Sequence, residues 1–493
     1  MAFERVTPES VGVRSEGILG FLEEAERRGV ELHGMMLLRH GKVCAEGWWK
    51  PYNPDSPHMM YSFTKSLTST AIGFARQEGK IALEDKLCDI FPDKMPENAG
   101  ENVRSCTVRD LLTMTCGHHT EIMMFDPDGS DWVTNFLAHE FPHVPGTTFL
   151  YNTAGTNLLV AILKRRTGED LMAYLKPRLF EKIGMSDIEC FTMPDGIQMG
   201  GAGSRIKTED MARFIQFVAN HGAWNGEQLL EKEWFEMATA KQVETISPAY
   251  DSASPDWRVG YGFQFWRCVP EHVCRADGAF GQYGIIFEEK DAVLILQSAA
   301  ADQQEQLTCA WMHILPALTD EETLPENPLT HVLQHRLANA EMHPMLSSRN
   351  PISERTSGGK IYTPKEKLPG LVDFIGGVWI VQPQGGMLES ISLTFEKDKA
   401  ILTAKQDNGT VTLDIGMNSH FAMGTLGGRT YGAVGRWRGA NRFETEIRCA
   451  EAVGGKRWIW NFTESGVTIE SDSTLPIAGG IAGDGFQTVE FVG

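Results

Sequence analysis

Long apolar runs are missing from this sequence of 493 residues. A membrane-spanning helix needs roughly 20 consecutive apolar residues, and no segment approaches that length. The apolar stretch and small-residue cleavage site of a secretion signal are also missing from the first residues, which read MAFERVTPESVGVRSEG. We therefore expect a protein that makes no contact with membranes and is located in the cytoplasm.

Close cysteine pairs are missing as well. The 9 cysteines are odd in number and scattered, and no CxxC pair indicates a zinc site. Free thiols in a reducing cytoplasm fit this pattern best. The adjacent His118 and His119 do not indicate a metal either, because neighbouring side chains converge poorly and no matching set of Asp and His residues is evident. We expect no metal.

Positive charge is scarce. The chain has 45 Lys and Arg against 65 Asp and Glu, which gives a formal net charge of -20. Nucleic acids and anionic membranes are polyanions, so this balance disfavours both as partners. Hydrophobic residues at 42% and charged residues at 22% describe a globular, water-soluble protein.

The first 320 residues have the pattern of one α+β domain. We expect two strands around the turn at His40-Gly41, a helix from Ser62 to about Gln77 and strands again near the end of this segment. The other expected elements are helices at 107–113 (capped by Thr107), 157–166 and 303–317, and strands at 260–266 and 283–298 with a turn at 289–290. Strands at both ends of a helical middle indicate one sheet that is flanked by helices.

The rest of the chain changes character twice. Residues 321–372 are rich in Pro, Ser, Asn and Gly and are predicted to be a linker, with a helix near 330–341. Residues 373–493 contain short alternating runs, such as SISLTFE, KAILTAK, GTVTLDI, FETEIRC, RWIWNF and GVTIES. Such runs predict an all-β domain, either a small barrel or a sandwich, with Trp458 and Trp460 in its core.

A serine and a lysine three residues apart, Ser62 and Lys65, begin the helix after Met59. Positions i and i+3 lie on one helical face, so a lysine with a lowered pKa could take the proton of the serine hydroxyl. The unpaired N–H at a helix start could also donate to a developing oxyanion. The alternative is an ordinary serine N-cap with a lysine on the solvated side. Small residues around Lys65, in the run KSLTST, favour a buried lysine.

Further motifs decide between these readings. The run MMYSFTKSLTSTAIGFARQEGKIALEDKLCDIFP resembles the first motif region of the serine β-lactamase-like family. That family includes class C β-lactamases, penicillin-binding D-alanyl-D-alanine peptidases, and esterases and amidases of the same fold. TVRDLLTMTCGHH, PGTTFLYNT and GGAGSRIKTEDMARF resemble its next segments, in the family order. The run RADGAFGQY stands at the place of its third motif.

The resemblance implies a β-lactamase-like domain and acyl transfer without a cofactor. Ser62 would be the nucleophile, with Lys65 and Tyr151 as base and proton shuttle. The oxyanion would be held by the backbone N–H of Ser62 and that of Ala279, or of Phe280 if the alignment shifts by one residue. The all-β domain expected at 373–493 resembles the small barrels that several members of the family carry. Such a domain could cover the active site or mediate oligomerisation.

Two departures from the family pattern point to the substrate. Thr153 stands where the family has Asn, and Asn152 comes one position early. The third motif has no Lys or His, a loss that weakens recognition of a substrate carboxylate. We therefore expect an esterase first, then a D-amino-acid amidase or peptidase, then a β-lactamase. A catalytically weak binding protein that keeps the fold is the alternative outside enzymes.

Six residues are expected to contact the substrate, a small ester or amide or a short peptide. Asp277 could approach the oxyanion site or only stabilise a turn. Trp132 lies in the insert before the second motif, where it could shape an apolar pocket or pack within its loop. The six are Asn152, Thr153, Asp277, Gly278, Phe280 and Trp132. Homo-oligomerisation stays open.

Overall fold

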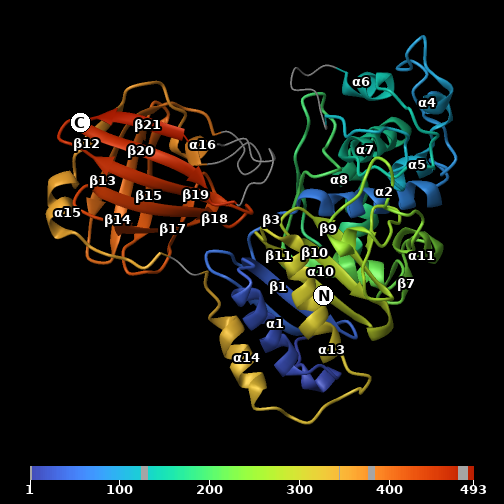
Figure 1. Cartoon of the computed structure of the whole chain (residues 1–493), viewed down its shortest axis with the longest axis horizontal. Coiled ribbons are helices and arrows are strands. Elements are labelled where there is room, and N and C mark those ends of the chain that lie inside the picture. The colour runs from blue at the N-terminus through green and yellow to red at the C-terminus, as the bar shows by residue number, and fades with distance from the viewer. Residues whose placement is uncertain (1–2, 124–130, 343–344, 376–383, 476–486) are drawn as a thin grey trace.

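The structure is a computed structural model that describes residues 3–123, 131–342, 345–375, 384–475 and 487–493. These residues form an α/β body and a β-barrel that lie beside each other (Figure 1). The expected α+β domain with an appended all-β domain is confirmed. Among the described helices, none combines the length and apolarity that crossing a membrane requires.

One antiparallel sheet forms the middle of the α/β body. Its order is β2-β1-β11-β10-β9-β8, so strands from both ends of the segment pair directly. Met35 on β1, for example, pairs with Leu296 on β11. The strands are β1 Leu32–Arg39, β2 Lys42–Trp48, β8 Trp266–Arg267, β9 Val273–Gly278, β10 Gln282–Phe287 and β11 Ala292–Ser298. The sheet therefore brings residues 32–48 and residues 266–298 into one layer.

Helices cover both faces of this sheet. One face is covered by four helical segments, in a core with Phe21 and Leu294. They are α1 Ser15–Arg27, α12 Gln303–Cys309, a π-helical segment Ala310–Ile314 and α13 Leu315–Ala317. The other face packs against α10 Thr208–Ala219 and the layer around α2 Thr64–Gln77. That layer and the loops around it also contain α3 Leu87–Ile90, α4 Glu101–Ser105, α5 Val108–Leu112, α6 Trp132–Ala138, α7 Thr153–Thr167, α8 Leu171–Leu175, α9 Glu181–Ile183 and α11 Lys232–Thr239. Small strands accompany it: β3 His58–Met59, β4 Glu189–Cys190, β5 Ser204–Ile206, β6 Ala223–Trp224 and β7 Glu227–Gln228.

Local signals placed most of these elements, with three corrections. The helix at 107–113 is α5, and Thr107 caps it as expected; the side chain of Asp110 completes a capping box. Ser62 is not the N-cap of α2: it lies in a 3-10 turn, Tyr61–Phe63, and Phe63 is the N-cap residue. The strand expected at 260–266 is reduced to the start of β8. The missed strand β9 carries the polar residues Arg275 and Asp277, which obscure its apolar alternation.

The segment 321–372 is divided between the two bodies. Helix α14, Leu329–Ala338, packs on β2 and α1 of the α/β body and matches the helix expected near 330–341. Helix α15, Pro351–Ser357, and strand β12, Ile361–Pro364, belong with the barrel, where β12 pairs with β13 and β21. The domain boundaries at 320 and 373 stay a prediction.

The second body is a closed, mostly antiparallel barrel. Its described strands follow the order β15-β14-β13-β12-β21-β20-β19-β18-β17-β16, and a parallel pair between Gly416 and Val434 joins β15 to β17. Trp458 and Trp460 lie in its core, as expected. The strands are β13 Leu388–Phe395, β14 Lys399–Gln406, β15 Gly409–Gly416, β16 Ala422–Leu426, β17 Arg429–Trp437, β18 Arg442–Cys449, β19 Gly455–Phe462, β20 Gly466–Ser473 and β21 Gln487–Val492, with helix α16 Leu371–Ile375 beside them.

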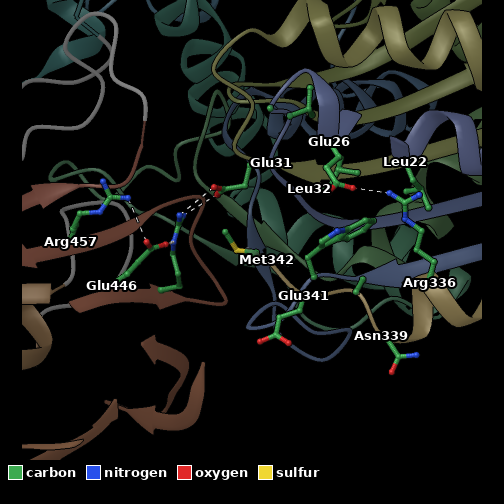
Figure 2. Close-up of a pocket in the computed structure, with 15 residues that line it drawn as sticks. Leu22, Glu26, Glu31, Leu32, Arg336, Asn339, Glu341, Met342, Glu446 and Arg457 are labelled. Carbon is green, nitrogen blue, oxygen red and sulfur yellow. Dashed lines mark hydrogen bonds and ion pairs between the residues drawn. The ribbon is translucent and has the colours of Figure 1, made fainter. Parts of the chain in front are cut away.

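An ion pair between the buried Arg448 and the half-buried Glu31 joins the barrel to the α/β body. Arg448 on β18 donates to both carboxylate oxygens of Glu31, at 2.9 and 3.2 Å, and to Glu446 at 2.7 Å. Figure 2 shows this contact at the edge of a cavity of about 450 Å³ between the two bodies. Glu31 also contacts the ring of His33, which bonds to His58 at 2.9 Å. The barrel is thereby linked to β3, the strand that leads into the turn at Tyr61–Phe63.

Candidate active site

The turn Tyr61–Phe63 places the Ser62 hydroxyl over the first turn of α2. Lys65 Nζ lies 2.9 Å from Ser62 Oγ. The turn is locally unusual because Tyr61 has φ 46, a left-handed conformation that non-glycine residues rarely adopt and that tends to occur at functional sites. The i, i+3 spacing expected from the sequence therefore becomes a direct contact.

Lys65 is buried, and no carboxylate of the described residues forms an ion pair with it. Its side chain is 1% exposed and donates to Gly201 O at 2.7 Å and to Thr153 Oγ1 at 3.2 Å. Burial lowers the pKa of Lys65 to about 7, against the opposing charges of Glu121 and Asp277. A neutral amine has two N–H groups and one lone pair. With those two donors used by Gly201 and Thr153, the lone pair is left for the Ser62 hydroxyl proton.

Two consecutive glycines bring the Gly201 carbonyl to Lys65. A Cβ on Gly200 would lie 2.2 Å from Val160 Cγ2 and 2.5 Å from Thr68 Oγ1. A Cβ on Gly201 would lie 2.6 Å from Thr153 Cγ2. This segment can approach α2 and α7 only because it has no side chains. The GGAGSRIKTEDMARF run, which resembles a segment of the family, thus supplies a hydrogen-bond acceptor to the site.

The ring of Tyr151 lies next to the Lys65 amine. Lys65 Nζ lies 4.9 Å from the centroid of its ring, and the ring stacks on Trp266 at 5.5 Å between centroids. Burial raises the pKa of Tyr151 above its ordinary value, Asp277 adds to that shift, and a hydrogen bond with Ser62 opposes it. At neutral pH Tyr151 is therefore a phenol that can donate, not a phenolate.

The end of β9 lies against the Ser62 turn. A Cβ on Gly278 would lie 2.1 Å from Met60 O and 3.2 Å from Phe63 N, so only glycine permits this approach. Within the described residues, neither the Ser62 N–H nor the Ala279 N–H has a protein acceptor, and both residues line the pocket. Two N–H donors at one concave surface have the character of an oxyanion site.

Phe280 holds the next position of this loop. Its φ is 64, and its carbonyl accepts from Ala300 N at 3.0 Å and from Ser298 Oγ at 2.7 Å. Its ring packs on Tyr61 at 5.4 Å between centroids. Phe280 thus packs behind the turn instead of lining the pocket, which leaves Ala279 as the pocket-lining residue of the two sequence alternatives.

A pocket of about 620 Å³ opens in front of Ser62. Five residues expected from the sequence line it together: Ser62, Tyr151, Thr153, Asp277 and Ala279. Residues from the three motif regions that resemble the family therefore lie around one cavity, as the resemblance implies. Their catalytic roles stay a prediction at this point.

Two further expected contact residues, Asn152 and Trp132, lie away from the pocket, besides Phe280 behind the turn and Gly278 at the end of β9. The Asn152 side chain is 0% exposed; it caps α7 by accepting from Gly155 N at 3.2 Å and turns its amide toward Cys116 and His118. Trp132 is 3% exposed and packs in the hydrophobic core beside Phe136. The structure brings neither side chain into the pocket. The alternative of packing within the insert therefore describes Trp132.

Asp277 is a strand residue on β9, not part of a turn. Its Oδ2 accepts from Arg275 Nε at 2.8 Å, and both side chains are buried, at 8% and 0% exposure. Burial raises the pKa of Asp277, while the Arg275 charge opposes that shift. Arg275 is in turn 4.5 Å from the ring centroid of Trp257. The chain therefore does carry a cation near its third motif, but the cation is buried and already paired.

Several pocket residues were not expected from the sequence. They are Tyr61, Glu121, Ile122, Ala202, Tyr250, Trp257, Trp266 and Gln303. Several of them stand in loops between elements, where no spacing rule applies. The clustering of aromatic residues between 250 and 266 was the one available signal.

Metal binding finds no support among the described residues, where no group of three or more His, Cys, Asp or Glu could hold an ion. His118 bonds to Asn152 and Cys116, and His119 bonds to His143 at 2.9 Å, so the adjacent histidines turn to different partners. All 9 cysteines are free.

The barrel reaches the surroundings of the turn. Met59 N donates to Glu451 O at 3.0 Å, across the boundary between the two bodies. Val453 and Leu475 of the barrel join Met59 and Tyr61 in one buried cluster, with Phe280 packed against it. Both left-handed residues beside the pocket, Tyr61 and Phe280, are therefore supported by side chains of the barrel.

An antiparallel sheet between helical layers, with a Ser-x-x-Lys turn at its edge, is the architecture of β-lactamase and transpeptidase-like proteins. The family model Beta-lactamase matches residues 21–314, and the chain belongs to this family.

Individual relatives are distant. The 6-aminohexanoate-dimer hydrolase of Paenarthrobacter ureafaciens is 24% identical over 283 residues, covering 53% of this chain and 71% of that protein. Among solved structures, a Bacillus anthracis protein provisionally assigned as a 6-aminohexanoate-dimer hydrolase has a TM-score of 0.50 at 21% identity, over 66% of this chain and 89% of that one. SurE, solved with D-Leu, has a TM-score of 0.50 at 15% identity over 86% of this chain and 98% of that one. These structures support the fold alone.

Proposed function

We propose that the protein is a serine hydrolase that acts on esters or amides through an acyl-enzyme, with carboxylesterase activity as the first expectation. The observation that carries the proposal is the 2.9 Å contact between Ser62 Oγ and the buried Lys65 Nζ. A lysine with a pKa of about 7 is neutral in a large fraction of molecules at neutral pH. It can then accept the serine proton, which activates a hydroxyl that is otherwise a weak nucleophile.

In the acylation step, Ser62 Oγ attacks the carbonyl carbon while its proton passes to Lys65. The carbonyl oxygen becomes an oxyanion and accepts from the N–H groups of Ser62 and Ala279. The tetrahedral intermediate then collapses, and the bond to the leaving group breaks. Lys65 returns a proton to the leaving group through the Tyr151 hydroxyl, which restores the neutral amine.

Deacylation uses the same groups in the other direction. A water molecule attacks the acyl-enzyme as Tyr151 takes the water proton and passes its own proton to Lys65. Because burial raises its pKa, Tyr151 acts as this relay and not as a free base. Ser62 then leaves with a proton from Lys65. No cofactor takes part in these steps.

The ranking of substrates follows from the pocket wall. The described residues that line the pocket include no Lys or Arg, and Arg275 behind them is paired with Asp277. A substrate carboxylate would find no partner at the surface, which disfavours β-lactams and peptide C-termini. Amide hydrolysis remains the second candidate, because the relative from Paenarthrobacter ureafaciens is named for hydrolysis of 6-aminohexanoate dimer.

The 9 free cysteines support a cytoplasmic location.

A substrate screen tests this proposal. We expect p-nitrophenyl acetate and butyrate to be hydrolysed, D-amino-acid amides more slowly, and penicillin or nitrocefin least. Hydrolysis of none of them, together with no covalent adduct from a fluorophosphonate, would support the alternative of a binding protein that keeps the fold.

Gly278→Ala is expected to lower kcat/KM for p-nitrophenyl butyrate by about 10²-fold, since the added Cβ meets the backbone at Met60 and moves one oxyanion donor away. Steady-state kinetics check this, with a thermal melt to establish folding. Gly100→Ala is the matched control, because φ there is -71 and a Cβ would meet nothing within 4 Å. Equal activity of the two variants would contradict the oxyanion assignment of Ala279.

Val453→Ala is expected to lower kcat about 5-fold with little change in KM, because the contact behind Tyr61 is lost and small displacements at the reacting groups are costly. Val467→Ala is the control: it removes the same two methyl groups from a buried site of the barrel core. Both changes should lower the melting temperature of the barrel. If both variants keep the wild-type kcat, the barrel does not support the turn.

A further inference from the structure

The pocket in front of Ser62 has an uneven distribution of charge. Two carboxylates, Asp277 and Glu121, are among its described lining residues, whereas no basic side chain is. Lys65 lies behind Ser62 and is buried. The described surface of the pocket therefore offers acceptors and negative charge to a ligand, and the cations Lys65 and Arg275 lie buried behind it.

Much of the pocket lining is aromatic. The half-buried rings of Tyr151, Tyr250 and Trp257 pack around the buried Trp266, at 5.5, 6.2 and 6.4 Å between ring centroids. The faces of such rings attract cations through their quadrupoles. The same wall already does so on its buried side, where the Arg275 guanidinium lies 4.5 Å from Trp257 and 5.7 Å from Trp266.

One carboxylate oxygen of Asp277 remains open. Arg275 takes Oδ2 alone, and Oδ1 accepts no hydrogen bond within the part of the chain that the structure describes. The Asp277 side chain is 8% exposed, and it lines the pocket. Glu121 also lines the pocket, is exposed, and is close enough to act on the charge of Lys65. A cation in the pocket would meet acceptors from both.

We propose that this pocket selects substrates that carry a substituted ammonium group close to the scissile carbonyl. Aromatic faces together with one or two carboxylates form the usual environment for such a group. A neutral substrate of the same shape fits less tightly, and a carboxylate is repelled. This inference rests on the proposed hydrolase function and adds the chemical class of its substrate.

Three thioesters of matched size test the proposal. S-Butyrylthiocholine carries the cation, S-(3,3-dimethylbutyl) thiobutyrate is its neutral isostere, and the S-(3-carboxypropyl) thioester carries an anion. Thiol release is followed with a disulfide reagent, and kcat/KM is compared at pH 8 and low salt. We expect the cationic substrate to exceed the neutral one by about 10-fold or more, because cation–aromatic and charge contacts add in a partly dry pocket. The anionic substrate should be the slowest.

Glu121→Gln separates a pocket effect from overall charge. We expect the ratio of cationic to neutral kcat/KM to fall several-fold in this variant. Glu140→Gln is the matched control, because it removes the same charge from an exposed position that does not line the pocket. Trp257→Leu should lower the ratio as well, without changing the number of charges.

The outcomes are distinct. Hydrolysis of the neutral thioester with no preference for the cation overturns this inference and leaves the proposed function standing. An equal fall of the ratio in the Glu121 and Glu140 variants also overturns it, since the preference would then come from net charge. Hydrolysis of none of the three overturns the proposed function, and this inference with it.

Discussion

Ser62→Ala is expected to lower kcat/KM for p-nitrophenyl butyrate by on the order of 10⁴-fold or more, because the acyl-enzyme can no longer form and only binding and the oxyanion donors remain. Fluorophosphonate labelling should disappear in the same variant. The substitution removes one hydroxyl from a half-buried turn, so the fold should persist. Full retention of hydrolysis would remove the basis of the proposed function.

Ser69→Ala is the matched control for this change. Ser69 lies on the same helix, is 0% exposed, and its hydroxyl has no hydrogen-bond partner in the described structure. It should therefore keep wild-type activity. A similar loss in both variants would indicate damage to α2 and not removal of a nucleophile.

The pH dependence of the wild type should follow the titration of Lys65. Only the neutral amine can accept the Ser62 proton, and the pKa of Lys65 is lowered to about 7. For a group that works in its deprotonated form, kcat/KM is low below that pKa and rises with pH until it levels above it. We expect an ascending curve with its midpoint near pH 7. Tyr151 should add no second step in this range, because burial raises its pKa above the ordinary value.

Lys65→Met keeps the length of the side chain and removes the base. We expect a loss of about 10²–10⁴-fold in kcat/KM, the usual contribution of general acid–base catalysis. The ascending limb near pH 7 should be lost with it. A variant that is slow but retains the same midpoint would show that another group titrates, and Lys65 would then be only a structural contact of Ser62.

Local sequence signals predicted the structure correctly where the interacting residues are close together in the sequence. Thr107 was predicted to cap the helix at 107–113, and in the structure it does so, with Asp110 completing a capping box. The spacing of Ser62 and Lys65 predicted one helical face, and the two atoms meet at 2.9 Å. The family motifs then placed Tyr151 and Ala279 at the same pocket, although no local pattern connects segments so distant in the chain.

Other features depended on packing that the sequence does not display. Asn152 had the identity of a substrate-contact residue, but its amide caps α7, since a helix start offers unpaired N–H groups nearby. Trp132 entered the core because its helix presents an apolar face there. Gly201 acts through a backbone carbonyl, which every residue has and no motif marks. The contact of Val453 with Tyr61 joins two bodies and has no signal in either alone.

The most direct test of the account is the position of the covalent intermediate. The protein is mixed with p-nitrophenyl butyrate or a fluorophosphonate, quenched in acid, digested and analysed by peptide mass spectrometry. The account predicts one adduct, a butyryl or phosphonyl group on Ser62, which is absent from Ser62→Ala. An adduct on another residue, or turnover of the ester without any adduct at Ser62 under either reagent, would contradict it.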